Sequence, residues 1–283
     1  MKFKLKDSVR IREENEDKII LFDTETELLH EVNGIGYDII KLCNGKNTKK
    51  DIENILISEF KEIKQDDIKN DITNFIRQLE LNNLIEIIPV EIADKIYLYG
   101  SELGSFTYYI DDDKKILIDA GVLVKKPIDM IIVTHCHFDH ILFLNELKKM
   151  NGCEIICGEK DKRDIEELTE KVMVNLSPKN IVPTKVDTVV KNGDVIKTNN
   201  FTFSILETPG HTDGSISVYD KHKSILFSGD AWFGGDNQGK WIYLSGSEKQ
   251  SKDTLNILKK INPKCIFPGH WGIIISNRNY RIQ

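Results

Sequence analysis

The chain lacks any apolar run long enough to cross a bilayer, and its first residues lack the apolar core of a signal peptide. It also lacks a basic excess. The formal net charge of −6 offers no electrostatic surface for nucleic acid or an anionic membrane. Cysteine is sparse, with five residues and no dense disulfide framework. We therefore expect a cytoplasmic protein with reduced thiols and no membrane or nucleic-acid partner.

Histidine is also uncommon, but its placement follows a pattern. Five of the seven histidines, together with Asp139 and Asp230, form four short clusters, and His30 and His222 lie outside them. Neutral imidazoles and carboxylates are the ligands that zinc or iron selects, and two carboxylates among five imidazoles can hold two cations. The sequence therefore predicts a two-metal site. The candidate ligands are His135, His137, Asp139, His140, His211, Asp230 and His270.

Each cluster follows a predicted strand. Residues 129–133 form a short apolar, β-branched run that leads directly to the first cluster. Similar runs at residues 201–206, 224–227 and 265–267 precede the other three clusters. Loops that leave one end of a rigid sheet commonly carry functional sites. We therefore expect an α/β domain whose strand ends bring the ligands together.

The run Thr134-His135-Cys136-His137-Phe138-Asp139-His140 resembles the HxHxDH signature of the metallo-β-lactamase-fold superfamily. The Thr-Pro-Gly-His-Thr run around His211, Ser-Gly-Asp ending at Asp230 and Pro-Gly-His ending at His270 resemble its later ligand motifs. Residues 116–121 resemble its early strand with an Asp-x-Gly turn. The resemblance covers residues 91–283 and implies an αββα sandwich.

The resemblance also implies a division of the ligands. One metal ion would be held by His135, His137 and His211, the second by Asp139, His140 and His270, and Asp230 would bridge them. Zinc is the expected metal and iron the alternative. A hydroxide between the metals would be the nucleophile, oriented by Asp139 as the catalytic residue. No separate general acid is evident.

The first ninety residues have a different pattern. Runs at residues 9–12, 19–23 and 27–32 predict three strands, and residues 84–88 predict a fourth. Helical spacing predicts helices over residues 35–43, from an N-cap at Thr48, and over residues 68–79. This order predicts a small winged-helix-like domain over residues 1–90, joined to the catalytic domain without a long Gly/Ser tether.

Residues 28–45 and 75–84 resemble the PqqD family, also called the RiPP recognition element. The resemblance implies binding of the leader part of a ribosomally made precursor peptide. The peptide would add a strand beside the third strand, with the third helix as an apolar wall. A winged helix used for homodimerisation stays an alternative. The residues expected to contact the peptide are Leu28, Leu29, His30, Glu31 and Val32.

Residues 231–243 contain glycines and polar residues typical of a loop, and this loop leaves the candidate ligand Asp230. Its aromatic side chains either line a substrate pocket or anchor the loop. Tyr108 and Tyr109 are further pocket candidates. The loop residues concerned are Trp232, Phe233, Trp241 and Tyr243.

Three functions fit these features. The first is a binuclear metal-dependent hydrolase acting on a precursor peptide, or on an ester, thioester or amide, captured by the N-terminal domain. The second is an iron-dependent oxidase or oxygenase that modifies a peptide in RiPP or cofactor biosynthesis. The third is a peptide-binding or chaperone protein with a structural metal site. The open ligand set favours an enzyme, and we expect the hydrolase.

Overall fold

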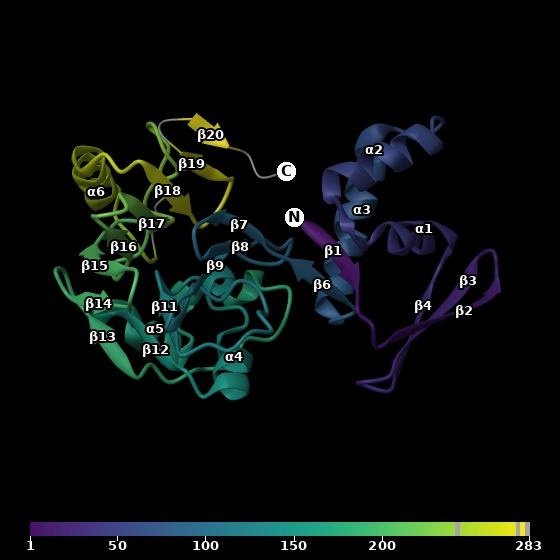
Figure 1. The fold of residues 1–283 in the computed structure, drawn as a ribbon, viewed down its shortest axis with the longest axis horizontal. Helices are drawn as coiled ribbons and strands as arrows, with labels where there is room; N and C mark the ends of the chain where they lie inside the picture. The colour runs from purple at the N-terminus through teal and green to yellow at the C-terminus, as the bar shows by residue number, and fades with distance from the viewer. Residues whose placement is uncertain (241–243, 276–277, 281–283) are drawn as a thin grey trace. The chain divides into compact units, whose positions relative to one another are not determined.

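The computed structural model describes residues 1–240, 244–275 and 278–280 and divides into two compact units, Met1–Val90 and Glu91–Ile282 (Figure 1). Each unit has its own strands, helices and apolar core, so each is described by itself. In the described part of the chain, no helix combines the length and apolar character needed to span a bilayer.

The N-terminal unit contains two three-stranded antiparallel sheets, with strand orders β2-β3-β4 and β5-β1-β6. The three helices of this unit occur where helical spacing predicts them. The elements are β1 (Lys2–Leu5), β2 (Val9–Asn15), β3 (Lys18–Asp23), β4 (Leu28–Val32), α1 (Gly34–Leu42), β5 (Asn44–Thr48), α2 (Lys49–Glu59), α3 (Gln65–Leu81) and β6 (Ile85–Ile88).

Strands β1 and β5 were not predicted. β5 has the sequence Asn-Gly-Lys-Asn-Thr, which contains no apolar residue and is typical of a helix stop. It is a strand because its backbone pairs with β1, whose Phe3 enters the core. Thr48, at the end of β5, is the predicted N-cap of α2, and its hydroxyl accepts a hydrogen bond from the Asp51 backbone N–H at 3.2 Å.

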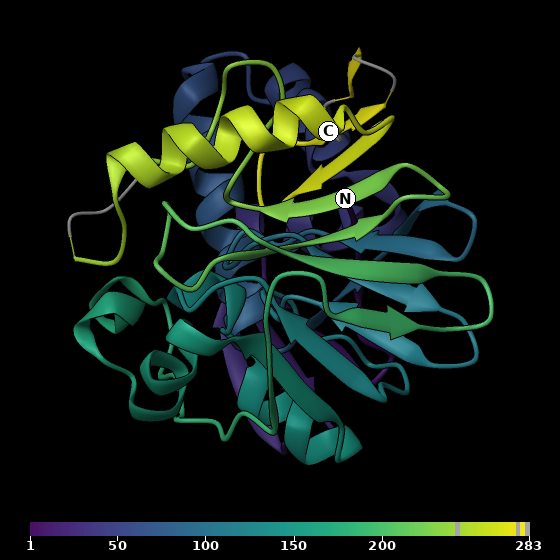
Figure 2. The same ribbon diagram turned by 90° about the vertical axis from the view of Figure 1, so that its left-hand side faces the viewer.

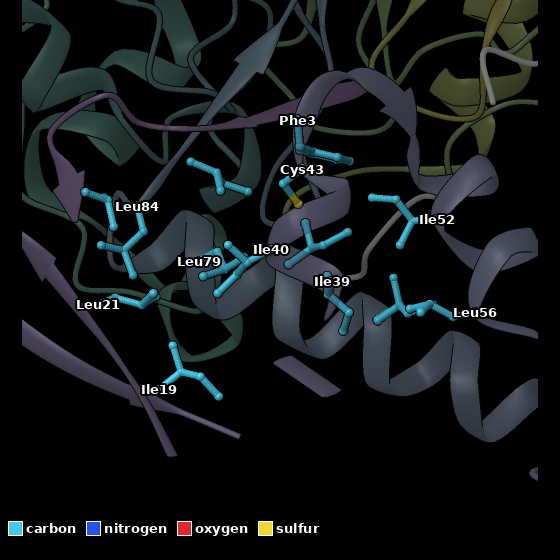
Figure 3. Close-up of a cluster of buried hydrophobic side chains, with 14 of the residues drawn as sticks. Phe3, Ile19, Leu21, Ile39, Ile40, Cys43, Ile52, Leu56, Leu79 and Leu84 are labelled. Carbon is cyan, nitrogen blue, oxygen red and sulfur yellow. The ribbon is translucent and has the colours of Figure 1, made fainter. Parts of the chain in front are cut away.

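One apolar face of each helix supplies the core of the N-terminal unit (Figure 3). Ile39 and Ile40 come from α1, and Ile52 and Leu56 from α2. Strand β3 contributes alternate residues, so its opposite face remains outside this core. Strand β4 pairs with β3 only, which leaves its second edge without a partner strand among the described residues.

The C-terminal unit contains two seven-stranded sheets. The first has the order β13-β12-β11-β10-β9-β8-β7, and the second β14-β15-β16-β17-β18-β19-β20. The strands of the first sheet are β7 (Val90–Ala93), β8 (Ile96–Tyr99), β9 (Thr107–Asp111), β10 (Lys115–Ile118), β11 (Met130–Val133), β12 (Glu154–Gly158) and β13 (Thr188–Val190). Those of the second are β14 (Val195–Lys197), β15 (Thr202–Glu207), β16 (Ile216–Asp220), β17 (Ile225–Gly229), β18 (Cys265–Pro268), β19 (Ile273–Ile275) and β20 (Arg278–Tyr280).

Helices lie on the outer sides of these two sheets, which confirms the expected α/β sandwich (Figure 2). α4 (Leu144–Asn151) and α5 (Lys162–Glu167) lie beside the first sheet. α6 (Glu248–Ile261) packs Leu255 and Leu258 against Leu226 of the second sheet. Between the sheets, the ring of Tyr108 lies 5.6 Å from that of Phe267. Stacked and edge-on aromatic contacts of this kind join the two layers.

The sheet topology brings the ligand-bearing loops to a common edge. β17 runs parallel to β18, whereas β15 and β17 are both antiparallel to β16, the strand between them. β15, β17 and β18 therefore point in the same direction, and their carboxyl ends lead to His211, Asp230 and His270. In the first sheet, β11 ends two residues before His135.

Candidate metal centre

The structure brings all seven candidate ligands together in overlapping groups. Each group contains three residues whose ligand atoms all lie within 4.8 Å of one another. The groups are His135, His137 and His211; His135, His140 and Asp230; and Asp139, His140 and His270. The first and third correspond to the two triads that the resemblance implies.

The first triad is buried. His135 Nε2 lies 3.1 Å from His137 Nδ1, and the ring of His211 lies 4.5 Å from that of His137. The three residues are at most 7% exposed. Three imidazoles with ligand atoms within 4.8 Å of one another can hold one of the two metal ions expected of a two-metal site.

The second triad is more open to solvent. His270 Nε2 lies 3.0 Å from Asp139 Oδ2, and His140 Nε2 lies 3.9 Å from the same oxygen. The His140 side chain is fully buried, whereas His270 is 31% exposed and Asp139 is 19% exposed. A substrate can therefore reach this triad from the side of His270 and Asp139.

The carboxylate of Asp230 lies between the two triads. Its Oδ2 is 3.4 Å from His211 Nε2, and its Oδ1 is 3.4 Å from His140 Nε2. Asp230 Oδ2 is also 3.7 Å from His270 Nε2. The carboxylate is therefore close to histidines of both triads, as expected of a bridging ligand.

Among the residues that the structure describes, three buried polar atoms at this centre have no hydrogen-bond partner: His140 Nε2, His211 Nε2 and Asp230 Oδ1. Buried polar atoms are normally paired, because an unpaired one loses its water without compensation. Cations at the two triads would give all three atoms a partner. The residues present therefore fit a pair of divalent metal ions.

The electrostatics of the centre also suit cations. Burial lowers the pKa of His135 well below its usual value, and it lowers the pKa of His137 to about 3. Burial likewise lowers the pKa of His211. These imidazoles are therefore neutral at neutral pH, which is the form that binds metal.

His140 differs from these three histidines. Burial acts to lower its pKa, but the carboxylates of Asp119, Asp139 and Asp230 outweigh burial and raise the pKa well above its usual value. In the absence of metal, a positive charge is therefore favoured at His140. A divalent cation at Nε2 would supply that charge in place of the proton.

Hydrogen bonds around the triads hold the imidazoles in place. Asp119 Oδ2 lies 2.8 Å from His140 Nδ1, and its Oδ1 accepts from the Thr134 N–H at 2.7 Å. The Lys240 carbonyl lies 2.9 Å from His211 Nδ1. Partners of this kind orient metal ligands and select their tautomer. The Asp-x-Gly turn was recognised in the sequence, but the bond from Asp119 to His140 was not.

Asp161 is a second residue that the sequence analysis missed. Its Oδ2 accepts hydrogen bonds from the Cys136 N–H at 2.9 Å and from the Thr212 hydroxyl at 2.8 Å. Cys136 lies between two histidines of the first triad, and Thr212 follows the third. One buried carboxylate thereby joins the two loops that carry the first triad. No motif marked it, since it is 25 residues from one partner and 51 from the other.

The Cys136 side chain belongs to a different buried cluster, with Asp161 and Asp164. Burial, together with those two carboxylates, raises the pKa of its thiol well above the usual value. Lys171 Nζ lies 3.5 Å from Asp164 Oδ2 and supplies a positive charge to the cluster. The thiol is therefore neutral and is not grouped with the histidine ligands, as expected for a side chain that points away from them.

The aromatic substrate candidates have different positions. Phe233 lies near the centre, with its ring 6.5 Å from that of His270. Trp232 packs in the core under α6 and donates its indole N–H to the Gly235 carbonyl at 3.0 Å, so it anchors the loop. Trp241 and Tyr243 lie outside the described residues.

The two tyrosine candidates have structural roles. Tyr108 is buried and donates its hydroxyl to the Pro268 carbonyl at 2.6 Å. Tyr109 donates to the Pro127 carbonyl at 3.1 Å. Neither side chain is therefore part of the substrate site that we propose below.

The five peptide-contact candidates form β4. Leu28 and Leu29 are 56% and 68% exposed, and Glu31 is exposed, whereas His30 is half-buried and Val32 packs against the core. The main apolar side chains of α3, including Ile72 and Ile76, are buried in that core. The exposed apolar surface at β4 therefore comes from the strand itself rather than from these α3 residues.

Two family models match this chain, one in each unit. Residues 100–270 match the family model of the metallo-beta-lactamase superfamily, and the chain belongs to that superfamily. Residues 18–85 match the family model of coenzyme PQQ synthesis protein D (PqqD). The N-terminal unit is thus a PqqD domain, and its description as a winged helix stays a prediction.

Individual relatives agree with this assignment. The chain is 30% identical over 200 residues to a probable metallo-hydrolase from Methanocaldococcus jannaschii, covering 62% of this chain and 92% of that protein. It is 34% identical over 163 residues to the hydroxyacylglutathione hydrolase GloC of Haemophilus influenzae, covering 53% of this chain and 73% of GloC. The crystal structure of TTHA1623 in a di-iron-bound form superposes with a TM-score of 0.54 at 22% identity, covering 67% of this chain and 95% of that chain. The chain is therefore similar to known metallohydrolases.

Proposed function

We propose that this protein is a binuclear metal-dependent hydrolase whose substrate is a ribosomally made precursor peptide, or an ester, thioester or amide, captured by the N-terminal unit. The observation that carries the proposal is the set of buried ligand atoms on His140, His211 and Asp230 that have no hydrogen-bond partner among the described residues and lie at the two triads. A protein that only bound a peptide would have no need for such a centre.

Two divalent cations at this centre would lower the pKa of a bound water to about 7 and polarise the attacked carbonyl. The chain supplies the rest. Asp139, on the exposed side beside His270, is placed to accept a hydrogen bond from the attacking water and so to orient it. Asp230 would fix the separation of the two triads. Asp119 holds the His140 ring so that its Nε2 faces Asp139 and Asp230.

The relatives favour hydrolysis over oxidation. The proteins from M. jannaschii and H. influenzae are both named as hydrolases. Iron chemistry stays the alternative, because imidazole and carboxylate ligands suit iron as well as zinc. We propose zinc as the resident metal, with the ligand division inferred from the sequence.

The N-terminal unit supports a peptide as substrate. One edge of β4 pairs with no strand of the described part of the chain, and it lies next to the exposed apolar side chains of Leu28 and Leu29. An extended peptide can add to such an edge through its backbone, while its side chains contact the flanking apolar residues. Residues 1–90 would then act as the capture domain and residues 91–283 as the catalytic domain, with binding raising the local substrate concentration.

Elemental analysis of the full chain, purified without added metal, tests the centre. We expect about two zinc ions per chain in the wild type, because the two triads together offer two positions. His211→Ala should lose about half of the bound metal, because it removes one ligand of the buried triad. His222→Ala is the matched control, since His222 is exposed and outside the centre. A wild type free of transition metal would contradict the proposal.

Peptide capture is tested by fluorescence anisotropy with a labelled cognate precursor peptide. The double variant Leu28→Asp/Leu29→Asp should weaken binding at least about 10-fold, because two exposed apolar contacts become charged. Ile63→Asp, at another exposed apolar position of the same unit, should bind like the wild type. Equal binding by all three proteins would remove β4 from the proposed site.

A further inference from the structure

Trp271 directly follows the candidate ligand His270 and has two uncommon properties. Its side chain is 74% exposed, the largest value among the exposed large hydrophobic residues of the described chain. Its backbone also has φ +69°, in the left-handed region that favours glycine. A bulky aromatic residue in this conformation is uncommon, and such strain is often found at functional sites.

The backbone that leads to Trp271 is held firmly. The Gly269 N–H donates to the Gly229 carbonyl at 2.9 Å, and the Gly269 carbonyl accepts from the Phe106 N–H at 2.8 Å. The buried Tyr108 hydroxyl donates to the Pro268 carbonyl at 2.6 Å. Bonds to both sheets therefore fix the turn that carries His270 and Trp271. An aromatic ring on such a support is preorganised for contact with a ligand.

Trp271 also has an aromatic neighbour at the metal centre. Its ring lies 4.6 Å from that of Phe233, at an interplanar angle of 47°. Phe233 is almost buried and lies 6.5 Å from the His270 ring. The Phe233–Trp271 pair thus forms an apolar wall beside His270, with its outer ring exposed.

We propose that the Phe233–Trp271 pair is the specificity element of the centre and binds a flat aromatic group attached to the attacked carbonyl. This inference rests on the proposed function, since it concerns a substrate bound at that centre. The substrate class is then a peptide, ester or thioester with a large apolar group on the acyl side of the bond. A small or charged acyl group would leave the wall uncovered.

The direction of approach supports this occupant. Among the candidate ligands, His270 and Asp139 are the ones that solvent reaches best, at 31% and 19% exposure. A carbonyl brought to the metals from that side passes next to the residue that follows His270. The group attached to the carbonyl then contacts the exposed Trp271 ring, and stacking on an aromatic face favours a flat apolar group.

Two metal-chelating probes test the inference without requiring turnover. Acetohydroxamate and benzohydroxamate share the chelating group and differ in the apolar group next to the carbonyl. We expect calorimetry on the metal-loaded full chain to show that benzohydroxamate binds about 10-fold more tightly. Trp271→Gly should reduce this ratio to about 1 and leave acetohydroxamate binding unchanged. Glycine is the sharpest replacement, because it removes the ring and also suits the positive φ.

Two further variants separate the ring from general apolar surface. Trp271→Phe retains a flat ring and should keep most of the benzohydroxamate preference. Met150→Ala removes another exposed apolar side chain, on α4, and should leave the ratio as in the wild type. Metal content is measured for each protein, so that weaker probe binding caused by lost metal can be told apart from weaker binding caused by the missing Trp271 ring.

The failures are distinguishable. If a metal-loaded wild type binds neither hydroxamate, the centre is not an open hydrolytic site, and both the proposed function and this inference fall. If both probes bind but Trp271→Gly keeps the benzohydroxamate preference, the inference alone is wrong. The proposed function would survive that result, because acetohydroxamate binding depends on the metals.

Discussion

Asp119 Oδ2 lies 2.8 Å from His140 Nδ1, and both side chains are almost completely buried. This contact keeps a proton on Nδ1, so that Nε2 is the nitrogen left to bind a metal ion together with Asp139 and His270. The same carboxylate accepts from the Thr134 N–H and hydroxyl, one residue before the first triad begins. A single side chain at the end of β10 therefore orients residues on both sides of the candidate centre.

Asp119→Ala should weaken metal binding at the second triad about 10- to 100-fold, as is typical when the partner of a metal-bound histidine is removed. The first triad should retain its metal more strongly, because its histidines keep their own partners. Competition with a coloured chelator measures the two affinities. Asp220→Ala, which removes another buried carboxylate of the same unit, is the control. Equal metal binding by both variants would contradict the role of Asp119.

The raised pKa of Asp161 should make the free energy of unfolding depend on pH. Burial raises its pKa to about 6, against opposing hydrogen bonds from Thr212 and Cys136. The folded state therefore holds the proton more tightly than the unfolded chain, in which an aspartate has its ordinary pKa of 3.8. The stabilisation from this group is complete below about pH 4 and is lost as the pH rises through about 6.

The variant Asp161→Asn removes this titration. Between pH 5 and pH 7.5, the wild type should lose about 1–2 kcal/mol of stability relative to the variant. Urea unfolding of the metal-free full chain measures the difference by tryptophan fluorescence, since all three tryptophans are in the C-terminal unit.

Asp112→Asn is the control for this titration. Burial acts to raise the pKa of Asp112, but Lys95, Thr198 and Asn200 outweigh it and lower the pKa, so Asp112 stays ionised over this pH interval. Its variant should therefore show the same slope as the wild type between pH 5 and pH 7.5. A wild type and an Asp161→Asn variant with parallel pH profiles would contradict the raised pKa of Asp161.

The sequence predicts elements and sites where one local pattern determines the outcome. The apolar run of β11 before His135 and the Pro-Gly turn before His270 are local patterns, and these elements lie where they were expected. β5 was missed because its pairing with β1 comes from tertiary contacts rather than from its polar sequence. Asp161 was missed for the same reason, as its partners are distant in the chain.

Local sequence patterns also did not determine which aromatic side chains near the centre are exposed to solvent. Trp232 and Phe233 are adjacent in sequence, and the sequence left pocket lining and loop anchoring open for both, but Trp232 packs under α6 and the Phe233 ring lies 6.5 Å from that of His270. The sequence did not predict a role for Trp271, because the Pro-Gly-His motif ends one residue before it. Its exposure and positive φ are visible only once the chain is folded.

In the N-terminal unit, the lowered pKa of Asp23 should reduce the free energy of unfolding in acid. The Ser8 side chain, the Glu25 N–H and the Thr26 hydroxyl lower its pKa to about 2, although burial acts in the opposite direction. Its stabilisation is therefore present above about pH 4 and is lost as the pH falls toward 2. Asp23→Ala also leaves the buried Lys6 with one partner fewer and should destabilise this unit by about 2–3 kcal/mol.

Hydrogen exchange of the β3 backbone amides measures that loss at neutral pH. The control is Asp66→Ala, because Asp66 is exposed at the start of α3 and pairs only at the surface with Lys69. Its variant should exchange like the wild type. Unchanged protection of β3 in Asp23→Ala would show that Asp23 does not hold the β2-β3-β4 sheet in place.

Gly269 offers the most direct test of the geometry of the centre. A Cβ atom at this position would lie 2.6 Å from His140 Cε1 and even closer to Asp230 Oδ1, so an alanine must displace the bridging carboxylate or the histidine. Gly269→Ala should therefore reduce the metal content by at least half, measured by elemental analysis. Gly152→Ala is the control, because Gly152 has φ +63° and no heavy atom within 4 Å of the added Cβ. That variant should lose about 1 kcal/mol of stability and keep its metal. If Gly269→Ala binds metal like the wild type, Asp230 and His140 do not hold the cations in the positions proposed.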